Sequence, residues 1–178
     1  MFGNRSPNYI FKISIIAGND VGKKTLASYF AGQNDAGIFI TQGIQLGTLD
    51  IMVSGSFIQN SLWIYSNEEE YRNLFPYYIN GSNGMIMMYD ITKLESLNYL
   101  SEIYRLIKIF IKGDMPVLLA GNKIDLKGER RVRIEYIEKF KEIHNISIST
   151  EISLKTGENV EKMFRAISKL MIKHFNQK

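Results

Sequence analysis

Gly121-Asn122-Lys123-Ile124-Asp125-Leu126 directly follows a short apolar run, Val117 to Ala120, that is typical of a buried parallel strand. Doubly wound α/β folds bind their ligands where such strands end. A carboxylate there can accept hydrogen bonds from N1–H and the exocyclic amine of guanine, and adenine lacks this pair of donors. We therefore predict that Asp125 selects guanine, since another base would leave buried polar groups unpaired. Asn122 would tie this loop to a phosphate-binding loop, and the stem of Lys123 would lie over the base. A simple polar turn after a strand is the alternative.

Strand patterns alternate with helical patterns along the rest of the chain, and a hairpin turn is expected at Ser54-Gly55-Ser56. The predicted strands are Tyr9 to Ala17, Ile44 to Val53, Phe57 to Trp63, Gly84 to Tyr89, Val117 to Ala120 and Ile146 to Ile152. We expect a three-layer doubly wound α/β fold, with a six-stranded, mostly parallel sheet, one antiparallel edge strand and about five helices. Residues 1–178 would form one domain with its core at about 9–175.

Composition excludes several classes of site. The 178 residues carry a formal net charge of +4 and include no cysteine, which excludes disulfides, thiolate metal sites, nucleophilic thiols, prenylation and palmitoylation of this chain. No apolar run is long enough to span a bilayer, and no secretory signal opens the chain, so we expect a cytoplasmic protein without a direct membrane anchor. The basic residues from Lys127 to Arg133 are interrupted by Glu129, so we predict a solvated loop and no nucleic-acid partner.

The stretch from Ala17 to Thr25, Ala-Gly-Asn-Asp-Val-Gly-Lys-Lys-Thr, is close to the phosphate-loop pattern G-x-x-x-x-G-K-[ST]. In that pattern backbone N–H groups and a helix N-terminus hold phosphates, and the lysine neutralises them. Two registers compete. One places Gly22-Lys23 on the Gly-Lys pair and Lys24 on the hydroxyl position, and the other begins at Gly18 and places Lys23 where glycine is needed.

The flanking residues favour the first register. The lead-in Phe11-Lys12-Ile13-Ser14-Ile15-Ile16 and the following Leu26 and Phe30 are similar to Ras/Rab-type small GTPases, which the chain resembles over nearly its whole length. Further matching pieces are Tyr71-Arg72, Tyr77-Tyr78, Gly81, Gly84, Tyr89-Asp90-Ile91-Thr92, the Asn-Lys-x-Asp stretch, and Glu151 to Val160. The resemblance implies a P-loop NTPase fold of the Ras-like G-domain type, with GTP or GDP as ligand. It implies that the nucleotide contacts are Gly18, Asn19, Asp20, Val21, Gly22, Lys23, Lys24, Thr25, Thr41, Asn122, Lys123, Asp125, Ser153, Leu154 and Lys155.

The chain departs from the family where Mg²⁺ and catalysis are expected. The family has Ser or Thr at position 24 and Asp at position 64 for Mg²⁺, and this chain has Lys24 and Ile64. Asn67 replaces a glycine that senses the γ-phosphate, and Glu68 replaces the water-orienting Gln. Thr41 is the only matching Mg²⁺-ligand position, so we expect weak or absent Mg²⁺ and assign no catalytic residue. Other departures are Ala17 for the first glycine, Asp20 for a small residue, and Gln33-Asn34-Asp35 where an aromatic residue usually packs on the base.

Three functions stay open at this level. The first is a guanine-nucleotide-binding regulatory or scaffold protein with slow or absent hydrolysis. The second is an active GTPase switch, in signalling or vesicle traffic, completed by a partner's arginine. The third is a nucleotide-free interaction module. Effectors or regulators would bind the switch face, which we define as Ile38 to Leu46 with Trp63 to Phe75, through an apolar set that includes Ile38-Phe39-Ile40, Ile44, Leu46 and Trp63.

Overall fold

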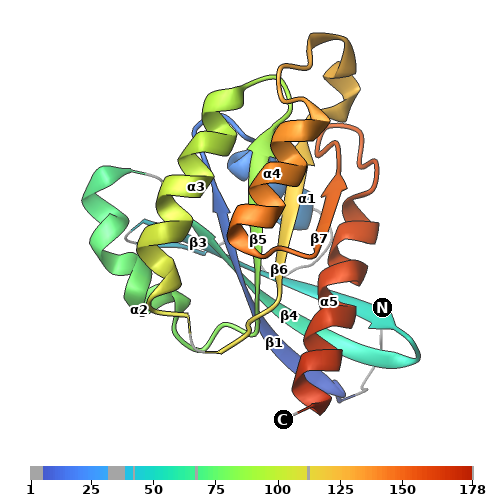
Figure 1. Ribbon diagram of the computed structural model, residues 1–178. Coiled ribbons are helices and arrows are strands. Elements are labelled where there is room, and N and C mark those ends of the chain that lie inside the picture. The colour runs from blue at the N-terminus through green and yellow to red at the C-terminus, as the bar shows by residue number, and fades with distance from the viewer. Residues whose placement is uncertain (1–5, 32–38, 42, 67, 112, 178) are drawn as a thin grey trace.

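A computed structural model describes residues 6–31, 39–41, 43–66, 68–111 and 113–177. Within these residues the strands form one sheet in the order β2-β3-β4-β1-β5-β6-β7 (Figure 1). The strands are β1 (Tyr9–Ala17), β2 (Phe39–Thr41), β3 (Ile44–Val53), β4 (Ser56–Tyr65), β5 (Gly84–Asp90), β6 (Val117–Asn122) and β7 (Ile148–Glu151). Strands β4, β1, β5, β6 and β7 are parallel, so their carboxyl ends share one edge.

Helices cover both faces of this sheet. They are α1 (Lys23–Ala31), α2 (Phe75–Ile79), α3 (Leu94–Lys108), α4 (Ile134–His144) and α5 (Val160–Asn176), with short 3₁₀ helices η1 (Glu69–Leu74) and η2 (Ile124–Glu129). Side chains of α1 and α5 share one core cluster with the sheet, and those of α2, α3 and α4 share the other. The three-layer α/β class is therefore confirmed. None of the helices in the described ranges is long and apolar enough to cross a membrane.

The hairpin also forms as predicted, with β3 antiparallel to β4 and Ser54 and Gly55 both at positive φ in the turn. The short strand β2 pairs antiparallel with β3 and lies outside it, so it adds a strand to the six that were expected. Its three residues are too few to show a period-two pattern, which explains why the sequence did not indicate it.

The apolar run Met85-Ile86-Met87-Met88 lies at the centre of the protein and is completely buried. Ile86 and Met88 belong to the cluster under α1 and α5, whereas Met85 and Met87 belong to the cluster under α2, α3 and α4. Successive side chains of a strand point to opposite faces, so a strand covered on both sides is apolar at every position. This run is therefore part of the core on both faces of the sheet.

Strand β6 is longer than predicted, because Gly121 and Asn122 continue it and pair with Tyr89 and Asp90 of β5. A Cβ on Gly121 would lie 2.6 Å from the Tyr89 hydroxyl, so the glycine leaves room for that ring. The extension places the side chain of Asn122 at the edge of the sheet itself rather than in a loop beyond it. By contrast, β7 begins two residues later than the predicted Ile146.

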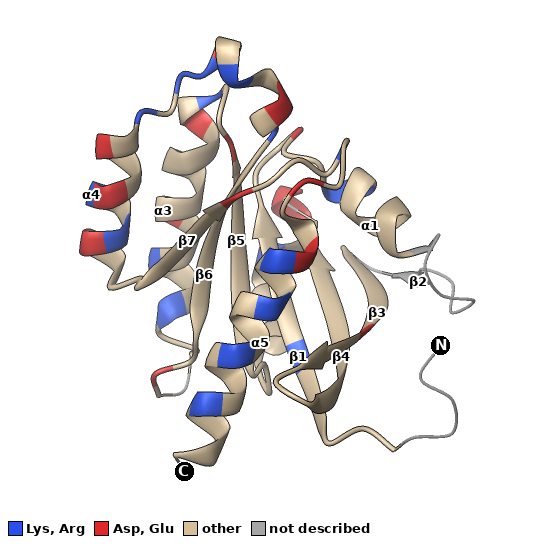
Figure 2. Ribbon diagram, turned by 90° about the vertical axis from the view of Figure 1, so that its right-hand side faces the viewer, with Lys and Arg blue, Asp and Glu red and all other residues tan. Residues whose placement is uncertain are grey.

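Figure 2 shows acidic and basic residues distributed over α4, α5 and the loop that precedes α4. In the cluster from Lys127 to Arg133, Arg130 forms a two-point ion pair with Glu151 of β7, with distances of 2.7 and 2.6 Å. One positive charge of the cluster therefore pairs with β7 and holds the loop against the sheet. The absence of a nucleic-acid partner stays a prediction.

A chain of hydroxyl groups joins the end of β4 to β1 and to the loop before β5. The Tyr65 hydroxyl lies 2.6 Å from Ser14 Oγ of β1, which in turn lies 2.6 Å from Ser82 Oγ in the loop before β5. Tyr65 is buried, its ring packs against Phe75 of α2, and burial raises its pKa well above the usual range. The hydroxyl is therefore protonated at neutral pH and anchors the segment that follows β4.

Replacing Tyr65 by Phe removes this hydroxyl and keeps the ring. We expect Tyr65→Phe to lower the free energy of unfolding by about 1–2 kcal/mol, because one buried hydrogen bond is lost. Urea unfolding monitored by circular dichroism measures the change. Tyr77→Phe is the matched control, since the Tyr77 side chain is 75% exposed, and equal effects of the two substitutions would contradict the assignment.

Candidate functional site

The loop from Gly18 to Gly22 connects the end of β1 to the start of α1. The Lys23 side chain points back toward this loop, and its amine donates hydrogen bonds to the carbonyl oxygens of Ala17 and Gly18, at 3.0 and 2.9 Å. Asp20 and Gly22 have positive φ values of 56° and 115°. A carboxylate residue tolerates the left-handed region better than most, which explains how Asp20 occupies a position where glycine is usual. The loop therefore presents a helix N-terminus and one lysine to the same space.

Gly22 settles the register of the phosphate-loop pattern. A Cβ at this position would lie 2.6 Å from Asn122 Nδ2, and its φ of 115° also favours glycine. The second glycine of the pattern is thus Gly22, Lys23 is the lysine, and Lys24 stands at the hydroxyl position.

Asn122 connects three loops at the end of β6. Its Nδ2 donates to the carbonyl oxygen of Val21 in the phosphate loop at 2.6 Å, and its Oδ1 accepts the N–H of Leu154 at 3.0 Å. The predicted tie between Asn122 and the phosphate loop is therefore present. The contact to Leu154 was not predicted, because nothing in the spacing of residues 122 and 154 indicates that they meet.

The predicted base-recognition residues lie together on two neighbouring loops. Asp125 accepts a hydrogen bond from Ser153 Oγ at 2.7 Å, and Ser153 Oγ in turn accepts the N–H of Thr156 at 3.1 Å. This arrangement orients the Asp125 carboxylate through one of its oxygens. Leu154 is buried, whereas Lys155 is exposed beside it.

Lys123 is held by an ion pair, and the expectation that its stem covers the base stays a prediction. It has a left-handed backbone conformation with a φ of 73°, and its amine lies 2.7 Å from Asp90 Oδ2 at the end of β5. Burial alone would raise the pKa of Asp90, but hydrogen bonds from Lys123 and Thr92 lower it below the usual value. The pair is therefore ionised and fixes the Lys123 side chain across the strand ends.

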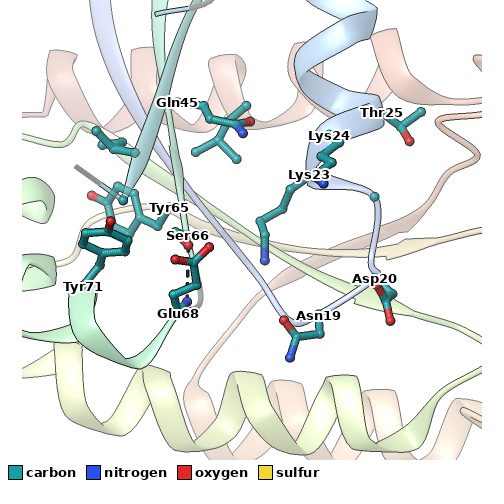
Figure 3. Close-up of a pocket in the computed structure, with 14 residues that line it drawn as sticks. Asn19, Asp20, Lys23, Lys24, Thr25, Gln45, Tyr65, Ser66, Glu68 and Tyr71 are labelled. Atoms are coloured by element: carbon teal, nitrogen blue, oxygen red, sulfur yellow. Dashed lines mark hydrogen bonds between the residues drawn. The ribbon is translucent and has the colours of Figure 1, made fainter. Parts of the chain in front are cut away.

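A pocket of about 780 Å³ opens in front of the phosphate loop (Figure 3). One wall is the loop and the start of α1, and the other wall comes from β3, β4 and the segment that leads into η1. The lining residues are Asn19, Asp20, Gly22, Lys23, Lys24, Thr25, Gly43, Ile44, Gln45, Ile64, Tyr65, Ser66, Glu68 and Tyr71. Among the described residues, none from the predicted base-recognition loops lines this pocket. Those loops are connected to its first wall by the hydrogen bond from Asn122 to Val21 of the phosphate loop.

The second wall holds two segments together, Gly43 before β3 and the stretch with Ser66 and Tyr71 after β4, and we call this set of contacts the latch. The N–H of Ser66 donates to the carbonyl oxygen of Gly43 at 2.7 Å, and the ring of Tyr71 lies against Gly43 so closely that a Cβ there would overlap it. Gly43 also has a positive φ of 75°. Gly43 is therefore required by Tyr71, a role that the sequence did not reveal.

The side chains at two of the expected Mg²⁺ positions, 24 and 64, do not fit this ion. Ile64 is 3% exposed and packs in the core cluster under α1 and α5, and Lys24 offers an ammonium group instead of an oxygen. Figure 3 shows Thr25 directed away from Lys23 and Glu68. The backbone of Thr41 belongs to β2, but its side chain lies outside the described residues. In the described part of the chain, no group of three or more acidic or histidine side chains could hold a metal ion.

Glu68 stands on the wall opposite the phosphate loop, and Figure 3 shows its carboxylate facing the Lys23 amine across the pocket. Burial lowers the pKa of Lys23 to about 8, against the opposing influence of the carboxylates of Asp20 and Glu68. Asp20 also pairs with Lys93 at 3.4 Å. Asn67 and the stretch Gln33-Asn34-Asp35 lie outside the described residues.

The predicted switch face is partly core. Ile44 is buried, and Leu46 and Trp63 pack against the cluster under α2, α3 and α4. The Lys12 amine lies 3.7 Å from the centre of the Trp63 ring and covers part of it. Ile38 and the side chains of Phe39 and Ile40 lie outside the described residues. Ile44 is thus unavailable to a partner, and the Trp63 ring of β4 is partly covered by the Lys12 amine.

One comparison with known proteins bears on this site. A family model described as the Ras family matches residues 12–173 of the chain. The matched region contains the phosphate loop, both base-recognition loops and the two segments that form the latch.

The lowered pKa of Lys23 predicts a pH dependence of phosphate binding. Phosphates bind the protonated form of the Lys23 amine. The affinity for a phosphate ligand is therefore highest well below pH 8 and falls as the pH rises through that value. Between pH 7 and 9 we expect the affinity for GDP, measured by isothermal titration calorimetry, to fall about tenfold. Lys23→Arg is the control, because its guanidinium stays charged over this range and its affinity should change little. A constant affinity for the unmodified chain would contradict the role of Lys23.

Proposed function

The chain belongs to the Ras family and is a small-GTPase-like, nucleotide-binding protein, and from that premise we propose that it is a regulatory or scaffold protein that binds GDP or GTP and hydrolyses GTP slowly or not at all. The observation that carries this proposal is the contrast between two halves of one site. The base-recognition half is organised around Asn122 and Asp125, whereas positions 24 and 64 supply no oxygen ligand to a metal.

Nucleotide binding is supported by the hydrogen bonds that bring the predicted base-recognition and phosphate-binding residues together. Asp125 carries an exposed carboxylate, and Ser153 Oγ donates a hydrogen bond to one of its oxygens. Asn122 places this loop against the phosphate loop, where the N-terminus of α1 and Lys23 would hold the phosphates. Guanine is favoured over adenine, because only guanine presents two donors to one carboxylate.

We expect slow GTP hydrolysis because the residues at positions 64 and 68 do not neutralise the charge of the transition state. Phosphoryl transfer depends on positioning the attacking water and on neutralising the charge that develops in the transition state. Glu68 brings a negative charge to the position where the family has a neutral, water-orienting Gln, and Ile64 replaces the acidic residue associated with Mg²⁺. Both changes act against the same chemical step. Effectors or regulators would bind the exposed remainder of the switch face, and a cytoplasmic location is part of the proposal.

Thermal stability in the presence of nucleotides tests the proposed binding. At a GDP concentration of about one hundred times Kd, binding should stabilise the protein by about 2.7 kcal/mol and raise Tm by about 5–10 °C, whereas ADP should have no effect. Asp125→Ala should abolish the shift, and Asp114→Ala, which removes an exposed carboxylate outside the site, should retain it. Purified protein that releases no guanine nucleotide on denaturation and shows no shift with GDP or GTP would instead indicate a nucleotide-free interaction module.

Removing Mg²⁺ tests the second half of the proposal. The affinity for GDP should differ less than about threefold between buffers with Mg²⁺ and with EDTA, because the Lys24 ammonium partly replaces the ion. Lys24→Ala should weaken GDP binding about tenfold in both buffers, and Lys169→Ala, an exposed lysine of α5, should not. A large loss of affinity of the unmodified chain in EDTA would reject the idea. Multiple-turnover GTP hydrolysis, with the protein alone or with a partner, would favour an active switch.

A further inference from the structure

The charges that line the phosphate pocket are balanced. Among the described residues that line it, Lys23 and Lys24 are basic and Asp20 and Glu68 are acidic, so their formal charges cancel. A pocket that binds a chain of phosphates usually holds a surplus of positive charge, supplied by lysine and by Mg²⁺. Here the side chains at positions 24 and 64 add no metal ligand, so each phosphate beyond those held by the loop meets an environment with no surplus cation.

The two carboxylates are not equivalent. Asp20 is part of the phosphate loop, and its side chain is 78% exposed and pairs with Lys93 at 3.4 Å. Glu68 stands on the opposite wall, and Figure 3 shows its carboxylate directed into the pocket toward Lys23. Among the described residues that line the pocket, Glu68 is therefore the acidic residue on the wall opposite the phosphate loop.

The backbone of Glu68 is held in place from both sides. Its N–H donates to Ser66 Oγ at 3.3 Å, and its carbonyl oxygen accepts the N–H of Tyr71 at 3.1 Å in the first turn of η1. Ser66 is itself bound to Gly43 through the latch described above. The backbone that carries the exposed Glu68 side chain is thus anchored to the wall of the pocket.

The order of the groups along the site determines which phosphate Glu68 meets. Asn122 and Asp125 place the base end of a nucleotide beside Val21, and the phosphates then extend past the N-terminus of α1 toward the opposite wall. The phosphate farthest from the base is consequently the one nearest to Glu68. A triphosphate brings an additional negative charge to this wall, whereas a diphosphate ends before it.

We infer that Glu68 makes this site selective for guanosine diphosphate over guanosine triphosphate. The inference rests on the proposed function, since it concerns the same nucleotide site. Repulsion between the Glu68 carboxylate and the terminal phosphate weakens triphosphate binding, and the diphosphate is affected much less. The protein would then hold GDP as its resting ligand even where GTP is available.

Competition binding in EDTA at pH 7 and low salt tests the selectivity, with GDP and a non-hydrolysable β,γ-imido analogue of GTP as ligands. The unmodified chain should bind GDP at least about tenfold more tightly than the analogue. Glu68→Gln should reduce this ratio about tenfold, chiefly by tightening the binding of the analogue. Raising the ionic strength should also reduce the ratio for the unmodified chain, because salt screens the repulsion.

Glu69→Gln is the matched control, because it removes the same charge one residue away. The Glu69 side chain is 90% exposed and does not line the pocket, so the ratio should stay as in the unmodified chain. Equal affinities of the unmodified chain for the two ligands, or an unchanged ratio in Glu68→Gln, would overturn this inference while leaving the proposed function intact. Failure of every variant and of the unmodified chain to bind either nucleotide would contradict the proposed function and this inference together.

Discussion

The side-chain amide of Asn122 is the contact on which the site depends. It is buried at the end of β6, where it donates to Val21 in the phosphate loop and accepts from the N–H of Leu154 in the second base-recognition loop. Removing a buried partner of this kind leaves donor and acceptor groups without compensation, so the three loops are coupled energetically. The same amide explains why Gly22 has no side chain, since a Cβ there would collide with it.

The departures in residue type gather at the phosphate end of this framework. The Lys23 amine binds carbonyl oxygens of the loop between β1 and α1, and Ser66 binds Gly43 in the latch. The departures at positions 24, 64 and 68 concern one role, the neutralisation of phosphate charge by a metal and its surroundings. A fold can keep its shape while the site on it acquires a different function, because packing and site chemistry rest on different side chains.

Much of this arrangement could be predicted from local patterns. The apolar runs predicted β1, β5 and most of β6, and the turn residues Ser54 and Gly55 predicted the hairpin, because these features depend on neighbours in the sequence. The extension of β6 through Asn122 and the short strand β2 were missed. Both depend on pairing with a neighbouring strand, and pairing leaves no mark on polar or very short segments.

The sequence by itself determined the α/β class, a carboxylate at position 125 and side chains without a metal-binding oxygen at positions 24 and 64, since residue type alone decides whether a side chain can accept or coordinate. Only the tertiary structure decided that Lys123 pairs with Asp90, that Tyr71 closes on Gly43 and that Glu68 faces Lys23. These contacts join residues that lie far apart in the chain, so they arise from the way the strand ends and helices meet and not from any local pattern.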